Sequence, residues 1–289
     1  MKDDSSLSRR IRVALRTATS RWRPLPSVLI IGAQKCGTTS LFNYLVKHPQ
    51  INRGRTKEVH YFDLNYTKGE PWYRAQFPIT MRPTGNRHID ATPLYLFDQR
   101  CPERAAALIP SAHIIVLLRS PTERAYSQYQ HSVRRGHENR PFIEAIGTEL
   151  ERIDPDDPLK RFSGESFFSF RQHSYVRRGI YAPQIRGWLN HFDRRRMLIL
   201  DANYFFSNTQ EQIERTFDFI GVSRIDIAGL SVHKQGTYNE EIPEQARQIL
   251  DSFYTPYNVD LREMVNEDIS WLAYKKPGMS GRQKLIYNR

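Results

Sequence analysis

Short, fully apolar runs alternate with helical patterns along the chain. The runs at residues 28–31 (VLII), 114–118 (IIVLL) and 197–200 (MLIL) contain no polar position, which is typical of strands buried on both faces of a parallel sheet. Because helical patterns separate such runs, we expect an α/β fold: a single domain with a central parallel sheet flanked by helices. The pattern also predicts a short strand leading into a turn or helix at 88–95, helices at 39–46, 102–108, 210–220 and 243–253, a turn and a helix within 175–192, and an irregular excursion at 68–87.

A turn with two glycines, Gly32 and Gly37, joins the first apolar run to the helix that follows it. A strand, a glycine turn and a helix together point backbone N–H groups and the positive end of a helix at a phosphate. The triphosphatase loop requires a lysine directly after the second glycine, where this chain has Thr38, and the dinucleotide fingerprint is absent. We expect a P-loop-like turn in which Lys35 reaches the reacting centre; an ordinary strand–helix turn is the alternative. The residues expected to cradle the phosphate are Gly37, Thr38, Thr39 and Ser40.

The second apolar run leads directly into Arg119. Ser120 suits a helix N-cap, Pro121 the first helical position and Glu123 the last position of a capping box, so a helix should begin here. Arg119 would then lie at the carboxyl edge of the sheet, where open α/β sheets bind ligands. An arginine there can contact a phosphate through two N–H groups, and Ser127 could share that phosphate. The alternative is a plain surface ion pair.

Residues 57–63 (KEVHYFD) gather Lys, Glu, His and Asp in one short aromatic segment. The alternation predicts a strand or extended loop, in which Glu58 and His60 project to the same face. A carboxylate beside an imidazole near a phosphate loop forms a general-base arrangement. A surface strand with alternating polar side chains is the other interpretation.

The charge balance narrows the classes of partner. The 289 residues include 43 Lys and Arg against 31 Asp and Glu, a net charge of +12. This charge suits a nucleotide, a nucleic acid, an acidic glycan or a membrane surface as a partner; the alternative is that the basic surface is only well solvated.

Cys36 and Cys101 form neither a disulfide framework nor a metal-type cluster, so a reducing compartment is the simpler assumption. No apolar run is long enough to span a bilayer. We predict that residues 1–24 form a basic helix or arm, with peripheral contact to an anionic membrane as the alternative.

Three of these motifs together resemble those of the sulfotransferases that use PAPS (3′-phosphoadenosine 5′-phosphosulfate), in particular the carbohydrate, heparan-sulfate-type branch. GAQKCGTTSL is similar to the family's 5′-phosphosulfate loop, KEVHYFD to its catalytic-base segment and VLLRSPTERAYS to its 3′-phosphate motif. The resemblance spans about residues 28–261 and implies that residues 25–289 form one sulfotransferase domain. It also implies PAPS as the donor, PAP as the product and no metal.

The resemblance implies roles for single residues. Lys35 would contact the bridging oxygen and stabilise the 5′-phosphate leaving group. Glu58 would be the general base, with His60 and Asp63 placed beside it. The donor-binding residues that it implies are Lys35, Cys36, Gly37, Thr38, Thr39 and Ser40 for the 5′-phosphate, Arg119 and Ser127 for the 3′-phosphate, and Lys234, Gly236, Thr237 and Tyr238 in a later loop over the donor.

One departure from the pattern bears on the acceptor. The heparan enzymes commonly carry a lysine that contacts the anionic glycan where this chain has Ala91. This departure weakens the case for a heparan-like substrate, and no apolar run resembles a Golgi-type membrane anchor. We therefore expect a cytoplasmic, bacterial enzyme that acts on a hydroxyl or amine of a glycan, glycolipid or small hydroxylated metabolite, with no nucleic acid as a partner. Two other functions stay open: a nucleotide-dependent kinase of the P-loop type, and a non-enzymatic protein that binds polyanions.

Overall fold

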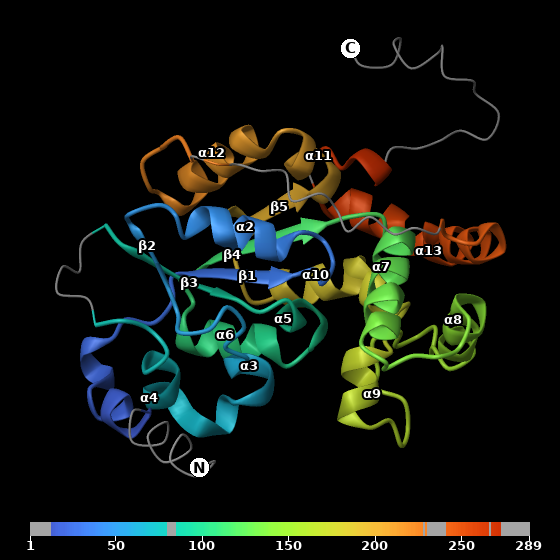
Figure 1. Ribbon diagram of the computed structural model, residues 1–289, viewed down its shortest axis with the longest axis horizontal. Helices are drawn as coiled ribbons and strands as arrows, with labels where there is room; N and C mark the ends of the chain where they lie inside the picture. The colour runs from blue at the N-terminus through green and yellow to red at the C-terminus, as the bar shows by residue number, and fades with distance from the viewer. Residues whose placement is uncertain (1–12, 80–84, 228, 230–240, 266, 273–289) are drawn as a thin grey trace.

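The computed structural model describes residues 13–79, 85–227, 229, 241–265 and 267–272. A five-stranded sheet in the order β2-β3-β1-β4-β5 forms its centre, and every neighbouring pair of strands is parallel (Figure 1). The strands are β1 (Val28–Gly32), β2 (Ile51–Arg53), β3 (Arg87–Ala91), β4 (His113–Leu118) and β5 (Met197–Asp201).

Helices cover both faces of the sheet and its carboxyl end (Figure 1). One face carries α2 (Thr38–Leu45), α11 (Ala202–Ser207) and α12 (Thr209–Ile220), and the other carries α5 (Leu94–Phe97), α6 (Cys101–Leu108) and α10 (Tyr181–Leu189). Beyond the carboxyl ends of the strands lie α7 (Pro121–Arg134), α8 (Phe142–Leu150), α9 (Phe167–Gln172) and α13 (Glu244–Met264). The other helical elements are α3 (Tyr61–Leu64), α4 (Gly69–Arg74) and the 3₁₀ turns η1 (Ser20–Trp22), η2 (Tyr66–Lys68), η3 (Arg177–Gly179), η4 (Arg194–Arg196) and η5 (Ser270–Leu272).

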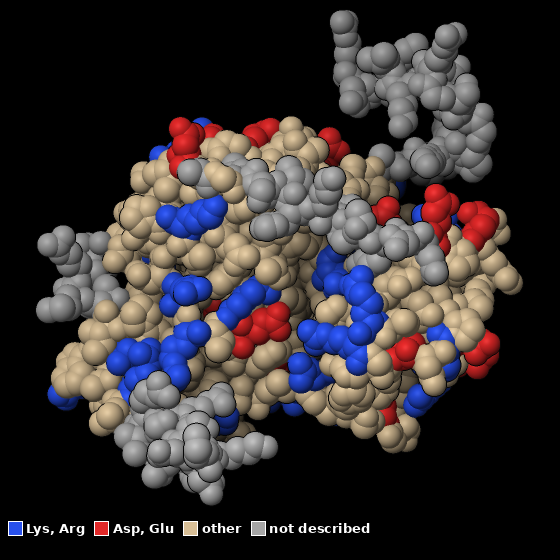
Figure 2. All heavy atoms as spheres, viewed as in Figure 1, with Lys and Arg blue, Asp and Glu red and all other residues tan. Residues whose placement is uncertain are grey.

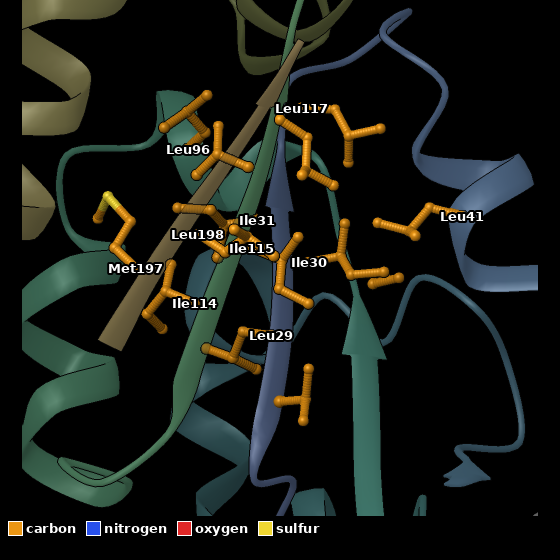
Figure 3. Close-up of a cluster of buried hydrophobic side chains, with 14 of the residues drawn as sticks. Leu29, Ile30, Ile31, Leu41, Leu96, Ile114, Ile115, Leu117, Met197 and Leu198 are labelled. Carbon is orange, nitrogen blue, oxygen red and sulfur yellow. The ribbon is translucent and has the colours of Figure 1, made fainter. Parts of the chain in front are cut away.

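The main hydrophobic core fills the space between the sheet and its two helical layers. Leu41 of α2 and Leu96 of α5 approach the central strands from opposite sides (Figure 3). Complete burial of an aliphatic side chain such as Ile115 contributes about 1.5–3 kcal/mol to folding. A second buried cluster, which includes Tyr175 and Tyr254, joins α7, α8, α9 and α13. This cluster fixes the helices at the carboxyl end of the sheet to one another.

The predicted parallel sheet with helices on both faces is confirmed. The apolar runs at 28–31, 114–118 and 197–200 are β1, β4 and β5, each one residue longer than the run. The helices predicted at 39–46, 102–108 and 210–220 are α2, α6 and α12, with ends that differ by one residue.

Some local predictions are wrong. Of the two alternatives for residues 57–63, the strand does not form: residues 58–60 have no regular secondary structure, and His60 adopts a left-handed conformation (φ 55°) that turns the chain into α3. The helix predicted to end at 253 continues to Met264 with Pro256 inside it, since buried residues before and after the proline hold both halves on the core. The pattern did not predict β2, α4, α8, α9 or α11, none of which is longer than nine residues.

The described part of the basic N-terminal segment packs against α4. Residues 13–18 are helical, and Arg16 donates to the carbonyls of Ala75 (2.5 Å) and Phe77 (2.6 Å). Arg23 donates to the same Phe77 carbonyl at 2.7 Å. The division of the chain at residue 24 stays a prediction. Within the described ranges, no helix has the length and apolar character needed to cross a membrane.

Candidate active site

A cavity of about 480 Å³ opens at the carboxyl edge of the sheet. It brings the turn after β1 together with Glu58, Arg119 and Ser127, which lie far apart in the sequence. On this face of the molecule, Lys and Arg side chains gather on both sides of a hollow, with acidic atoms beside them (Figure 2). The lining residues are Gln34, Lys35, Cys36, Gly37, Thr38, Thr39, Ser40, Lys57, Glu58, Pro93, Arg119, Ser127, His131, Arg135, Arg171, Gln172, Ala202 and Phe206.

The turn after β1 is shaped to receive an anion. Gly37 is the N-cap of α2 with a φ of 96°, a left-handed conformation that favours glycine. A Cβ at this position would lie 2.8 Å from the ring of Phe206. The first backbone N–H groups of α2, from Thr38 to Ser40, have no partner within the helix, and the helix dipole adds positive potential there. The turn therefore presents both N–H donors and hydroxyl groups to the cavity.

The Lys35 ammonium lies among other cations. Burial, together with the charges of Arg134, Arg119 and Arg135, lowers the pKa of Lys35 to about 8. In the part of the chain that the structure describes, Lys35 has no carboxylate as an ion-pair partner. An ammonium in such surroundings, with no carboxylate paired to it among the described residues, attracts a multiply charged anion.

Arg119 follows β4 at the carboxyl edge of the sheet, and its side chain is largely buried. Its Nη2 donates to Glu123 Oε2 at 2.6 Å and its Nη1 to the Lys35 carbonyl at 3.5 Å. Burial alone would lower the pKa of Arg119, but the hydrogen bond and charge of Glu123 raise it. Its buried Nε has no hydrogen-bond partner among the described residues. Ser127 lies one turn beyond Glu123 on α7 and lines the same cavity.

The predicted capping box at the start of α7 is wrong. The Ser120 side chain makes no cap hydrogen bond, and the Glu123 carboxylate pairs with Arg119 instead. A charge-assisted bond to a buried guanidinium is stronger than a bond to a neutral backbone N–H, which explains the exchange.

Glu58, His60 and Asp63 form a hydrogen-bonded row beside the cavity. His60 Nδ1 lies 2.6 Å from Asp63 Oδ2, and its Nε2 lies 3.4 Å from Glu58 Oε2. The Lys57 ammonium is 3.1 Å from the other oxygen of Glu58. Glu58 and Lys57 line the cavity, whereas His60 and Asp63 lie outside its lining. The predicted neighbours are thus brought together, but by a left-handed turn rather than by a strand.

The two carboxylates determine the charge of the imidazole between them. Burial would lower the pKa of His60, but its bonds to Asp63 and Glu58 outweigh that effect and raise it to about 9. Burial would likewise raise the pKa of Glu58, yet His60 and Lys57 lower it to about 2. At neutral pH an imidazolium therefore holds an ionised Glu58. The Glu58 side chain is 44% exposed, so water screens these charges and the carboxylate is open to an incoming group.

Helices α7 and α9 supply lining residues that the sequence interpretation missed. His131 on α7 and Arg135, the C-cap residue of α7, follow Ser127 at intervals of four residues, and Arg171 and Gln172 come from α9. Burial and neighbouring cations lower the pKa of His131 to about 4, so it is neutral at physiological pH. The four-residue spacing after Ser127 could have indicated His131 and Arg135. No pattern along the chain indicates Arg171, because tertiary packing brings α9 to the cavity.

Two buried arginines add positive charge near the cavity. Arg178 donates to Gln34 Oε1 at 2.7 Å and to a backbone carbonyl of α9 at 3.0 Å. Arg124 donates to Gln128 Oε1 at 2.7 Å and to the carbonyl of Tyr175. These acceptors are neutral, so they leave the guanidinium charges uncancelled. Burial lowers the pKa of Arg178 to about 9.

Two sets of predicted positions remain: Cys36, and the residues of the later loop. The thiol of Cys36 is buried, 3.8 Å from the Tyr181 hydroxyl, and burial raises its pKa, which disfavours a thiolate. No group of three metal-ligating side chains occurs within the described ranges. Lys234, Gly236, Thr237 and Tyr238 lie outside the described residues.

Comparisons with known proteins agree on one family. The model of the sulfotransferase domain matches residues 25–245. Human heparan sulfate glucosamine 3-O-sulfotransferase 3B1 is 29% identical over 272 residues, which cover 86% of this chain and 65% of that protein, so the chain spans less than two thirds of this relative. The crystal structure of a sulfotransferase from Alicyclobacillus acidocaldarius has a TM-score of 0.69 and 25% identity, covering 87% of this chain and all of that one. Mouse sulfotransferase SULT7A1, solved with PAP, shares the fold, with a TM-score of 0.51, 14% identity and coverage of 83% and 89%.

Proposed function

The chain belongs to the sulfotransferase family, and on that premise we propose that it transfers the sulfuryl group of PAPS to a hydroxyl or amine of an acceptor. One observation carries this proposal. A single cavity is lined by the glycine turn after β1, by Arg119 and Ser127, and by the Glu58 carboxylate, which come from segments far apart in the sequence. A donor with a 5′-phosphosulfate and a 3′-phosphate needs both phosphate sites, and a neutral acceptor needs the base.

The two phosphate sites differ in their chemistry. The turn at Gly37–Ser40 would bind the 5′-phosphate through backbone N–H groups, and Lys35 would meet the bridging oxygen. Arg119 and Ser127 would bind the 3′-phosphate. The contact between Arg119 Nη1 and the Lys35 carbonyl joins the two sites directly, so binding at one site supports the geometry of the other.

The transfer is an in-line displacement. The acceptor oxygen forms a bond to sulfur while the bond between sulfur and the 5′-phosphate oxygen breaks. Negative charge develops on that leaving oxygen, where the Lys35 ammonium and the N–H donors of the turn stabilise it. The acceptor proton passes to Glu58. His60 lies between Glu58 and Asp63, and its contacts with both carboxylates fix the orientation of Glu58. The products are the sulfated acceptor and PAP.

The cavity lining also favours a class of acceptor. Arg135, Arg171 and Lys57 line the same cavity as the proposed base, and the buried Arg178 adds to the positive potential. Such a lining favours an acceptor that carries a carboxylate, phosphate or sulfate near the reacting group. We infer an anionic glycan, glycolipid or small metabolite. The cytoplasmic location and bacterial source expected from the sequence stay predictions.

Donor binding and transfer can be tested separately. PAP should raise the melting temperature of the purified protein, because it binds the folded state. PAPS with a panel of anionic and neutral acceptors should yield products heavier by one sulfuryl group in mass spectrometry. A shift with ATP and Mg²⁺ but none with PAP would favour the kinase interpretation. Salt-dependent binding to heparin without any effect of PAP would favour a polyanion-binding protein.

A further inference from the structure

A buried carboxylate lies beneath the segment that carries Glu58. Asp90, in β3, is completely buried, and it lines no part of the cavity. Its Oδ1 accepts from the Thr92 hydroxyl at 2.8 Å, and its Oδ2 accepts from the hydroxyls of Tyr95 and Tyr73, each at 2.9 Å. Among the described residues no cation pairs with Asp90, and a buried carboxylate in that position is costly, so the three hydroxyl donors on this one group call for an explanation beyond packing.

Two of those hydroxyls also hold the backbone of the base segment. Thr92 Oγ1 accepts from the N–H of His60 at 3.4 Å, and the Tyr95 hydroxyl accepts from the N–H of Tyr61 at 2.7 Å. On the other side of Glu58, the N–H of Ala91 donates to the carbonyl of Lys57 at 3.4 Å. The end of β3 and the start of α5 thus contact the segment both before and after Glu58.

The direction of these bonds is fixed by chemistry. A backbone N–H can only donate, and an ionised carboxylate can only accept. Each hydroxyl has one proton, so it must donate that proton to Asp90 and offer its lone pair to the backbone. Asp90 therefore orients both hydroxyls as acceptors for the N–H groups of His60 and Tyr61. This is the point where the chain takes its left-handed conformation, with φ 55° at His60.

We propose that Asp90, acting through the hydroxyls of Thr92 and Tyr95, is the positioning residue for the base Glu58. The proposal rests on the proposed function, because it assigns a purpose to the geometry of that base. Loss of either hydroxyl frees a backbone N–H next to the left-handed turn. The His60 ring then no longer stays between Asp63 and Glu58, and the Glu58 carboxylate is no longer oriented toward the acceptor. Donor binding is unaffected, since none of these groups lines the phosphate loop.

Tyr73 provides a control within the hydrogen-bond network of Asp90. Tyr73 donates to the same Oδ2 as Tyr95 at the same distance, yet among the described residues its hydroxyl makes no hydrogen bond to the backbone of the base segment. Tyr73→Phe and Tyr95→Phe each remove one buried hydroxyl and keep the ring. If Asp90 acts only as a structural group, the two variants should behave alike. If it positions the base, only Tyr95→Phe should slow the transfer.

The experiment measures kcat, the Kd for PAP and the melting temperature for each variant. We expect Tyr95→Phe and Thr92→Val to lower kcat by about tenfold or more, because small displacements of a catalytic group have effects of this size. The Kd for PAP should stay within about twofold, and Tyr73→Phe should keep its kcat while losing a similar amount of thermal stability. Thr92→Ser, which retains the hydroxyl, should restore the rate lost in Thr92→Val.

Two outcomes overturn the proposal: equal kcat losses in Tyr73→Phe and Tyr95→Phe, or an unchanged kcat in Tyr95→Phe. If Tyr95→Phe does not fold, the comparison of Thr92→Val with Thr92→Ser decides, and equal rates for that pair reject the idea. Failure of the proposed function is distinguishable, because the wild-type protein would then transfer nothing from PAPS. Failure of this inference would instead leave an active wild type whose Glu58→Gln variant is inactive.

Discussion

The Lys35 ammonium should make the binding of PAP depend on pH. Burial and neighbouring arginines lower its pKa to about 8, so it loses its proton in a range where most lysines stay charged. If only the protonated form holds the 5′-phosphate, the Kd for PAP grows in proportion to 1 + 10^(pH − 8). This factor rises from about 1.1 at pH 7 to about 11 at pH 9, a tenfold loss of affinity or about 1.4 kcal/mol.

The assay is isothermal titration calorimetry with PAP at constant ionic strength, because screening changes phosphate contacts independently of pH. Lys35→Arg is the matched control, since a guanidinium keeps its charge throughout this range and its Kd should change by less than about twofold. Binding to the wild type near pH 8 should also take up about half a proton, visible as a dependence of the heat on the buffer.

Two results would refute this reasoning about Lys35. One is a wild-type Kd that stays constant between pH 7 and pH 9, which would mean that the ammonium does not contact the bound nucleotide or keeps an ordinary pKa. The other is an equal loss of affinity in Lys35→Arg, which would assign the pH dependence to a different group. His60 is not such a group by our account, because it lies outside the cavity lining.

Other predictions concern the base and the core. Glu58→Gln should lower kcat by about 10²–10⁴-fold and leave the Kd for PAP within about twofold, and full activity in this variant would remove Glu58 from the base role. His60 has a folded-state pKa of about 9, above its unfolded value, so its contribution to stability is complete below about pH 6.5 and disappears as the pH rises through 9. Urea titrations at pH 6 and pH 10 should show that the wild type loses about 2–3 kcal/mol more than His60→Gln across that interval, and equal losses would contradict the pairing with two carboxylates. Ile115→Ala, at a completely buried position in β4, should lower the free energy of unfolding by about 2–5 kcal/mol, whereas a loss below about 1 kcal/mol would contradict its place in the core.

The candidate site residues whose placement in the fold matches the prediction owe that match to local chain geometry. A strand, two glycines and a helix lie in one continuous stretch, so the turn that holds Lys35 could be recognised from residues 28–46 alone. Arg119 could be placed because a continuous apolar run ends immediately before it, which fixes it at the carboxyl edge of a buried strand. The closeness of Glu58 and His60 was also predicted, although the left-handed turn that produces it was not.

The parts that the sequence did not predict depend on contacts between distant segments. Arg171 reaches the cavity only because the second core cluster holds α9 against α7. The spacing of Glu123 from Ser120 fits a capping box, but the Glu123 carboxylate pairs with Arg119 instead. This pairing depends on the burial of Arg119, which sequence spacing alone does not reveal. Asp90 belongs to a short strand with an ordinary pattern, and only the folded chain shows that two of its three hydroxyl partners accept hydrogen bonds from the segment of residues 57–63.

The central claim is that one cavity holds both phosphates of PAP, with Arg119 responsible for the 3′-phosphate. Calorimetric titration of PAP and of 5′-AMP into the wild type and Arg119→Ala tests it most directly, because the two nucleotides differ only in that phosphate. Our account predicts that the wild type binds PAP at least about tenfold more tightly than 5′-AMP, since a charge-assisted contact contributes about 1.5–3 kcal/mol, and that Arg119→Ala binds the two nearly alike. Equal affinities in the wild type, or an undiminished preference for PAP in Arg119→Ala, would contradict it.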